Sequence, residues 1–231
     1  MYVYGKKVVE EILKNKKEIK KAYLYKKFSE KDIVLELQKR NIKIKYLEKF
    51  ELNRFANSNH QGIILEVPDY EYYRLEDLIS NDNALIVILN HLEDPHNLGA
   101  IIRTCEAASV DGIIIPKDRS VTVNATVMKV SAGALENVKI AKVTNLVNTI
   151  KKLKSMGFWI IGTDMEGTDY REIDYQGKIA LVIGNEGKGI SKLVKENCDF
   201  IASIPMYGKI NSLNASVAAG IFIYEAINAR R

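Results

Sequence analysis

The side chains best suited to chemistry in this sequence fall into three short clusters. The first reads NHLEDPHNLGAIIR over residues 90–103 and places Asn97, Gly99 and Arg103 at spacings of zero, two and six. In a helix that starts near Asn97, Arg103 lies under two turns along, so its long side chain can extend back toward the loop. A guanidinium there offers a permanently charged donor fork that suits phosphate. The simpler alternative is an N-cap asparagine followed by a surface arginine.

The second cluster is glycine-rich and covers residues 183–189, with the sequence Ile-Gly-Asn-Glu-Gly-Lys-Gly. Its glycines allow the backbone to approach a ligand closely and to expose N–H groups. The spacing differs from a dinucleotide-binding fingerprint, and Ile190 stands after Gly189 where a P-loop has its phosphate-binding lysine. Taken alone, this cluster predicts only a tight turn.

The third cluster combines Ile204-Pro205-Met206 with Ser212-Leu213-Asn214, which opens the last predicted helix. Apolar Ile204, Met206 and Leu213 suit the walls of a pocket for a flat ring. Ser212 or Asn214 can equally serve as an N-cap, and Met206 as a core residue.

The elements that position these clusters alternate between buried strands and helices. Apolar runs predict strands over 84–89, 112–115, 158–162, 180–183 and 200–204, and the intervening periodicity predicts helices over 99–108, 145–156, 190–196 and 215–229. Such an alternation favours a parallel α/β sheet that binds its ligand at the carboxyl ends of the strands. All three clusters follow predicted strands, so we expect them to share one site.

The N-terminal part predicts a separate small α/β unit. We expect helices over 7–15 and 29–40, the latter capped by Ser29 with Ile33, Leu35 and Leu37 on its apolar side, and strands over 21–25, 42–46 and 62–67. Residues 1–54 carry 16 Lys or Arg against 8 Asp or Glu, whereas residues 55–231 carry 18 against 21. This excess suits a polyanion such as RNA, with Tyr23, Tyr25 and Tyr46 as candidates for base stacking. A lysine-rich solvated surface and tyrosines that merely cover a strand explain it as well.

Composition excludes several other classes of protein. The chain is 47% apolar and 27% charged, no apolar run approaches the roughly 20 residues that span a bilayer, and the first residues lack the apolar region of a secretory signal. Cys105 and Cys198 do not form a disulfide framework, and no Cys or His stands at ligand spacing around His91 and His96. We therefore expect a reduced, cytoplasmic protein without a metal.

Read together, the clusters resemble the three motifs of the SpoU (TrmH-like) RNA ribose methyltransferases. Val3-Tyr4-Gly5 and His60-Gln61-Gly62 are similar to the N-terminal substrate-binding domain of the RlmB-type branch. The resemblance implies a SPOUT-type parallel sheet with a C-terminal trefoil knot, a homodimer with its active site near the subunit interface, and S-adenosylmethionine as cofactor. It divides the chain into an RNA-binding domain (1–67), a linker (68–80) and a methyltransferase domain (81–231).

The resemblance also implies roles for individual residues. Arg103 matches the catalytic arginine, which stays protonated at neutral pH and is thus better suited to clamp a phosphate and the developing alkoxide than to act as a base. The remaining catalytic candidates are Asn97, Glu186, Ser212 and Asn214. The candidates for binding the cofactor are Gly162, Ile183, Gly184, Asn185, Gly189, Ile204, Met206 and Leu213.

The function implied is 2′-O-methylation of a ribose, at a guanosine, in 23S rRNA, with no role for DNA or a membrane. Three alternatives stay open: a tRNA ribose methyltransferase, an rRNA methyltransferase that confers antibiotic resistance, and an RNA-binding assembly factor without catalysis. The N-terminal unit of about 70 residues counts against the first, and the complete set of motif residues counts against the last.

Overall fold

The structure is a computed structural model of the whole chain, and it describes all residues except 57–58, 80, 186, 188 and 231. The chain divides into two compact units. The first contains residues 1–71 and 123–133, and the second contains residues 72–122 and 134–231. The domain boundaries expected from the sequence stay a prediction.

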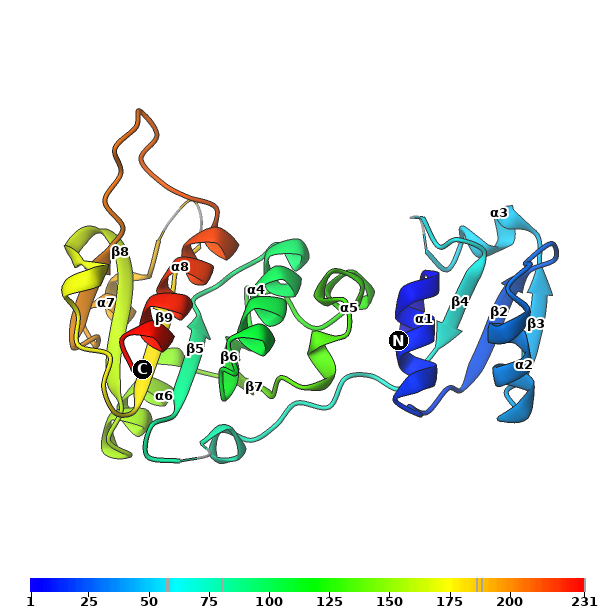
Figure 1. Ribbon diagram of the computed structural model, residues 1–231, viewed down its shortest axis with the longest axis horizontal. Coiled ribbons are helices and arrows are strands. Elements are labelled where there is room, and N and C mark those ends of the chain that lie inside the picture. Colours follow the sequence, from blue (N-terminus) through cyan, green and yellow to red (C-terminus); the bar gives the residue numbers. More distant parts are fainter. Residues whose placement is uncertain (57–58, 80, 186, 188, 231) are drawn as a thin grey trace. The chain divides into compact units, whose positions relative to one another are not determined.

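The first unit is built on a four-stranded sheet in the order β1-β4-β2-β3 (Figure 1). The strands are β1 (Tyr2–Tyr4), β2 (Lys21–Tyr25), β3 (Ile44–Leu47) and β4 (Ile63–Glu66). β4 is antiparallel to both β1 and β2, while β2 and β3 are parallel. The helices of this unit are α1 (Lys6–Lys14), α2 (Lys31–Lys39), α3 (Lys49–Leu52) and α5 (Ala125–Ser131).

The two N-terminal motifs meet in this unit. Gln61 Oε1 accepts a hydrogen bond from the backbone N–H of Lys6 at 2.9 Å, at the start of α1. His60 is 5% exposed, and its Nδ1 accepts from the N–H of Gly62 at 3.0 Å. Gly5 adopts φ 94°, and a Cβ at that position would lie 3.3 Å from Gln61 Oε1. The motifs therefore fix the turn into α1 and the turn before β4.

The second unit is built on a six-stranded parallel sheet in the order β10-β8-β9-β5-β6-β7. Its strands are β5 (Leu85–Leu89), β6 (Gly112–Pro116), β7 (Ile140–Val143), β8 (Trp159–Asp169), β9 (Ile179–Ile183) and β10 (Phe200–Ser203). The chain lays β5, β6 and β7 toward one edge and then returns to the other side of β5. The strand order thus reverses between β5 and β9, and in such sheets that is where ligands bind.

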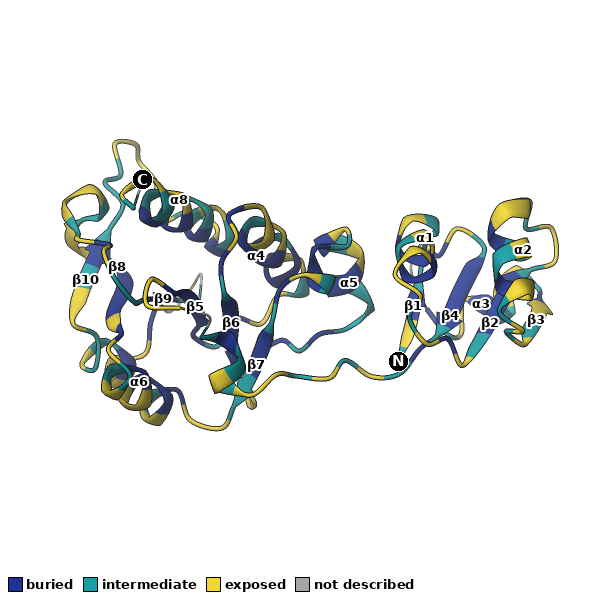
Figure 2. Cartoon of the chain, turned by 60° about the horizontal axis from the view of Figure 1, so that its bottom comes forward, coloured by how far each residue is buried: buried dark blue, intermediate teal, exposed yellow. Residues whose placement is uncertain are grey.

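Helices cover both faces of this sheet, which explains why its central strands are apolar throughout. They are α4 (Pro95–Ala107), α6 (Leu146–Ser155), α7 (Lys192–Lys195) and α8 (Ala215–Asn228), with short 3₁₀ turns at 75–78, 134–136 and 170–172. Figure 2 shows α4 and α8 on one side of the strands and α6 on the other. All five residues of β5 are buried, and burial of each aliphatic side chain contributes about 1.5–3 kcal/mol.

The structure confirms the parallel α/β sheet and the central strands, and it corrects details near their ends. β8 continues to Asp169, well past the predicted end at Gly162. Helix α2 is capped by Glu30 instead of Ser29, and Leu35 is 53% exposed because residues two apart cannot share one helix face. The C-terminal trefoil knot stays a prediction. Within the described residues, no helix combines the length and apolar character needed to cross a membrane.

Candidate active site

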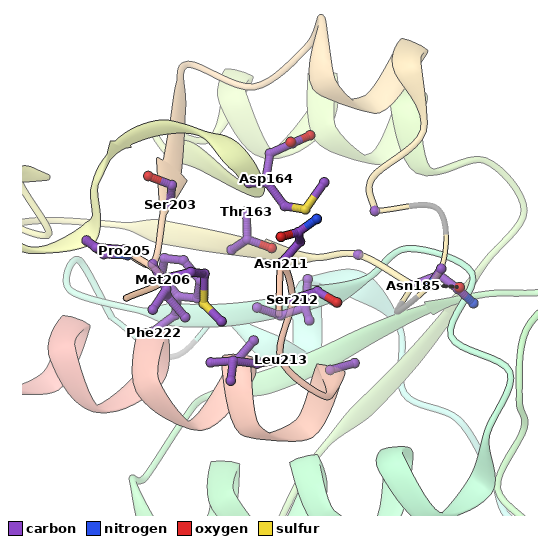
Figure 3. A pocket seen from close by; sticks show the side chains of 18 residues that line it. Thr163, Asp164, Asn185, Ser203, Pro205, Met206, Asn211, Ser212, Leu213 and Phe222 are labelled. Carbon is purple, nitrogen blue, oxygen red and sulfur yellow. Dashed lines mark hydrogen bonds between the residues drawn. The ribbon is translucent and has the colours of Figure 1, made fainter. Parts of the chain in front are cut away.

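A cavity of about 730 Å³ lies at the carboxyl ends of β9 and β10, beside the middle of β8 and the start of α8 (Figure 3). Its volume is that of a pocket for a small organic ligand or cofactor. The residues that line it are Thr163, Asp164, Met165, Ile183, Gly184, Asn185, Gly187, Gly189, Ser203, Ile204, Pro205, Met206, Asn211, Ser212, Leu213, Ala215, Ala218 and Phe222. The second and third sequence clusters thus form one site, as predicted from their positions after strands.

The walls of the cavity differ in polarity. Figure 3 shows Met206, Leu213 and Phe222 on the side of α8, whereas Thr163 and Asn211 lie across from them. Apolar side chains of this kind suit a flat aromatic ring, and the polar ones suit hydroxyl and charged groups. The cavity is therefore fitted to a ligand with an apolar and a polar end.

The glycine-rich turn closes on itself through backbone hydrogen bonds. Asn185 N–H donates to Gly189 O at 3.0 Å, and Gly189 N–H donates to Asn185 O at 2.8 Å. A Cβ on Gly184 would lie 2.4 Å from the carbonyl carbon of Gly189, so only glycine permits this approach of two backbone segments. Gly189 itself adopts φ 62°, the left-handed region that disfavours other residues. Both glycines are thus required by the shape of the turn.

Asp164 is the only carboxylate among the described residues that line the cavity. Its Oδ2 accepts from Lys195 Nζ at 2.9 Å, and its Oδ1 accepts from the N–H of Glu166 at 3.3 Å. Burial alone would raise the pKa of Asp164, but these hydrogen bonds from Lys195 and the backbone outweigh it, so the pKa is lowered. The rim of the cavity therefore keeps a negative charge that is balanced by Lys195.

A pair of asparagines joins the first sequence cluster to the third. Asn214 Nδ2 donates to Asn97 Oδ1 at 3.0 Å, and Asn97 is only 5% exposed. Asn214 is also the N-cap of α8, since its Oδ1 accepts from the N–H of Ser216 at 2.9 Å. The N-cap of α4 is Asp94 instead of Asn97. Asn97 thus has a tertiary contact instead of a capping role, and it ties the starts of α4 and α8 together.

Arg103 lies apart from the cavity. It is exposed on α4 and is not among the lining residues. Its helix buries Leu98, Ile101 and Cys105, so by helical geometry Arg103 lies on the opposite, outer face. Glu186, its expected partner in the glycine-rich turn, lies outside the described residues. The extension of the Arg103 side chain back toward the loop before its helix stays a prediction, and Arg103 does not line the cavity of its own chain.

All residues that the sequence predicts to bind the cofactor line the cavity, except Gly162. Gly162 does not line the cavity, because it is packed within the sheet where a Cβ would lie 2.8 Å from both Cys198 Sγ and Ile190 Cδ1. Its strand contributes Thr163, Asp164 and Met165 instead. The other seven candidates line the cavity: Ile183, Gly184, Asn185, Gly189, Ile204, Met206 and Leu213.

Sequence reasoning missed several of the lining residues, namely Ser203, Ala215, Ala218 and three further groups. Thr163, Asp164 and Met165 lie on the extension of β8, whose polar sequence hides the strand. Phe222 lies two turns into α8, where it resembles an ordinary core residue. Asn211 lies just before the third cluster and gives no signal of its own. Among the described residues, no group of three His, Cys, Asp or Glu side chains could hold a metal ion.

A parallel sheet with a cofactor-sized cavity at the carboxyl ends of β9 and β10 is typical of an α/β enzyme that binds a small organic ligand or cofactor. Residues 84–224 match the SpoU rRNA Methylase family, and residues 2–73 match the RNA 2′-O ribose methyltransferase substrate binding family. The chain belongs to the SpoU rRNA methylase family. It is accordingly an RNA methyltransferase of the class that uses S-adenosylmethionine as methyl donor.

Individual relatives agree with this membership. A putative TrmH family tRNA/rRNA methyltransferase from Bacillus subtilis, YacO, is 42% identical, covering 99% of this chain and 96% of its own. The AdoMet-bound rRNA methyltransferase from Sinorhizobium meliloti superposes with a TM-score of 0.79 at 26% identity, over 97% of this chain and 85% of its own. The SpoU methyltransferase AviRb from Streptomyces viridochromogenes superposes with a TM-score of 0.81 at 23% identity, over 99% and 89%, and so shares the fold.

Proposed function

We propose that this protein methylates the 2′-oxygen of a ribose, at a guanosine, in 23S rRNA. The observation that carries the proposal is the N-terminal unit, whose residues 2–73 match a substrate-binding family of RNA 2′-O ribose methyltransferases. Residues 1–54 also hold 16 basic against 8 acidic side chains, which suits the phosphate backbone of RNA. With such a substrate, we expect the protein to act in the cytoplasm.

The extent of structural similarity favours rRNA over tRNA. The rRNA methyltransferase from Sinorhizobium meliloti covers 97% of this chain. The A. aeolicus TrmH/SpoU tRNA modifying enzyme is 36% identical but covers 67%, with a TM-score of 0.60. A tRNA ribose is therefore the second candidate, supported by that higher identity over the shared part.

The cavity fits S-adenosylmethionine by the chemistry of its lining. Met206 and Leu213 would bound the adenine, and the backbone at Gly184 and Gly189 lines the same cavity. The bound cofactor supplies a methyl group already activated on a sulfonium. The protein's own tasks are to position the ribose hydroxyl and to manage one proton.

Arg103 is suited to stabilising the negative charge that develops when the ribose hydroxyl loses its proton. Its guanidinium would grip an RNA phosphate and stabilise the alkoxide that develops on the 2′-oxygen, while phosphate or water accepts the proton. Asn97 would hold the start of α4 through Asn214, and Ser212 at the cavity would fix the loop before α8. Glu186, at the glycine-rich turn, would hold Arg103 or a backbone amide.

The outward position of Arg103 supports a homodimer in which this arginine serves the cavity of the other copy. Mixed dimers test the arrangement. At a cofactor concentration below the wild-type dissociation constant, we expect Arg103→Ala and Gly184→Ala to be nearly inactive separately. Their mixture after joint refolding should recover about a quarter of wild-type activity, because half of the dimers are mixed and each holds one intact site. A mixture that stays inactive contradicts a shared site.

The substrate is tested with tritiated S-adenosylmethionine and in vitro transcripts of 23S rRNA, 16S rRNA and tRNA. The proposal predicts label in the 23S transcript, and mapping it by nuclease protection identifies the guanosine. Label in tRNA alone would replace the proposal by the second candidate. Absence of label in every RNA would favour the non-catalytic assembly factor.

A further inference from the structure

Arg103 and Arg119 differ from the other arginines that the structure describes. Each of the others has a partner for its guanidinium: Arg40 pairs with Glu36, Arg74 with Asp77 and Arg171 with Asp169, Arg54 lies over the ring of Phe50, and Arg230 donates to three backbone carbonyls. Within the described part of the chain, the guanidinium groups of Arg103 and Arg119 have none. Both are exposed in the second unit, so both are available to an anion from outside the protein.

The backbone at Arg119 is held in an uncommon conformation. Arg119 adopts φ 51° and His91 adopts φ 55°, and each left-handed non-glycine residue costs about 1–3 kcal/mol. Three contacts hold the two loops together. His91 Nδ1 lies 3.2 Å from Arg119 O, while Ser120 Oγ and Val121 N–H donate to Leu92 O at 3.1 Å and 2.7 Å. The loop after β6 is thus braced against the loop after β5.

The same brace reaches the cavity. Asn185, which lines the cavity, donates from its Nδ2 to His91 O at 3.0 Å. His91 therefore contacts both the glycine-rich turn and the backbone of Arg119. The loop after β5 leads directly into α4, which carries Arg103. Arg119 is consequently fixed at the same edge of the sheet as the cavity, in a loop whose other charges, Lys117 and Asp118, offset each other.

We propose that Arg119 binds a phosphate of the RNA whose nucleotide is methylated at the cavity of its own copy, as a second phosphate contact in addition to that of Arg103. The inference rests on the proposed function, because it assigns a further contact to the same substrate. An exposed guanidinium presents a rigid fork to two phosphate oxygens, and such contacts set the register of an RNA without reading its bases. The braced backbone fixes the point from which the Arg119 side chain extends, so no loop ordering has to be added to the entropy cost of binding.

The test compares Arg119→Ala with Arg74→Ala, which removes the same charge from an exposed site of the second unit that pairs with Asp77. Filter binding to 23S rRNA transcript at several salt concentrations gives the dissociation constant and its salt dependence. We expect Arg119→Ala to weaken RNA binding about tenfold and to lower the salt slope by about 0.7, the value for one contact to single-stranded RNA. Arg119→Lys keeps the charge without the fork and should recover the slope but only part of the affinity.

Two further measurements distinguish a loss of RNA binding from a loss of folding or of cofactor binding. Because the guanidinium of Arg119 has no hydrogen-bond or ion-pair partner among the described residues, the thermal midpoint and the affinity for S-adenosylmethionine should equal those of the wild type. RNA binding by Arg119→Ala within twofold of Arg74→Ala, with an unchanged slope, overturns the inference, and so does a loss confined to cofactor binding. Failure of the wild type to methylate any RNA would refute the proposed function instead, because the binding comparison does not depend on methyl transfer.

Discussion

Alanine substitutions in the glycine-rich turn should weaken cofactor binding to different degrees, because the space available to an added Cβ differs at each glycine. A Cβ at residue 184 meets backbone atoms of Gly189 at 2.4 Å and 2.8 Å and the N atom of Ile190 at 2.7 Å, so Gly184→Ala must open the turn. Overpacking of this kind costs about 1–3 kcal/mol, and 2 kcal/mol taken from the closed turn weakens cofactor binding about 30-fold. Gly189→Ala meets nothing within 4 Å but is strained at φ 62°, which costs about 1–2 kcal/mol. Gly187→Ala makes only an ordinary contact of 3.8 Å with Asn185 Oδ1 and serves as the matched control.

The three variants are compared by isothermal titration with S-adenosylmethionine, and the thermal midpoint of each is measured to confirm that it is folded at the temperature of the titration. The expected order of dissociation constants is Gly184→Ala well above Gly189→Ala, with Gly187→Ala within twofold of the wild type. Equal effects at all three positions, or a larger effect at Gly187 than at Gly184, would refute the claim that this turn shapes the cofactor site.

Three further predictions concern contacts away from the turn. A double-mutant cycle combines Asn97→Ala with Asn214→Ser, which retains an N-cap residue. The free energies of unfolding in urea should show a coupling of about 1 kcal/mol between the two substitutions. Additivity within about 0.3 kcal/mol would contradict a stabilising hydrogen bond between α4 and α8. Because the pKa of Asp164 is lowered in the folded protein, its ionisation stabilises the fold above the unfolded value near 4, and this contribution is lost as pH falls through the folded pKa. Asp164→Asn should thus be less stable than the wild type at pH 7, by a difference that shrinks as the pH falls below the unfolded value of about 4. A difference that does not shrink would argue against the ion pair with Lys195. Arg230→Ala removes hydrogen bonds to three carbonyls at 2.8–2.9 Å and should cost about 2 kcal/mol, or a fall of about 4–8 °C in thermal midpoint, whereas an unchanged midpoint would show that the C-terminal contact contributes nothing.

Much of the second unit could be predicted because its central strands are apolar on both faces. The strands at β5, β6 and β9 appear in the sequence as runs of aliphatic residues, and strand ends in a parallel sheet share one edge. The second and third clusters could therefore be predicted to lie together. The extension of β8 to Asp169 could not be predicted, because an exposed strand with the polar sequence after Gly162 has no such signature.

The role of the first cluster could not be predicted from spacing. A spacing of six from Asn97 to Arg103 does not say which face of the helix meets the core, and burial of Leu98, Ile101 and Cys105 turns Arg103 outward. The contact between Asn97 and Asn214 spans 117 positions and depends on the packing of α4 against α8. The brace between His91 and Arg119 was equally hidden, because left-handed backbone at non-glycine residues leaves no reliable mark in a sequence.

The central claim is that this chain transfers a methyl group from S-adenosylmethionine to a ribose 2′-oxygen of RNA. Alkaline hydrolysis of the tritiated product tests it directly, because a 2′-O-methyl group blocks cleavage of the adjacent phosphodiester. With wild-type protein, we expect the label in an alkali-resistant dinucleotide whose 5′ nucleoside is guanosine. Arg103→Ala should reduce the yield of this dinucleotide about 100-fold. Label released in mononucleotides, which means a methylated base, would contradict the account.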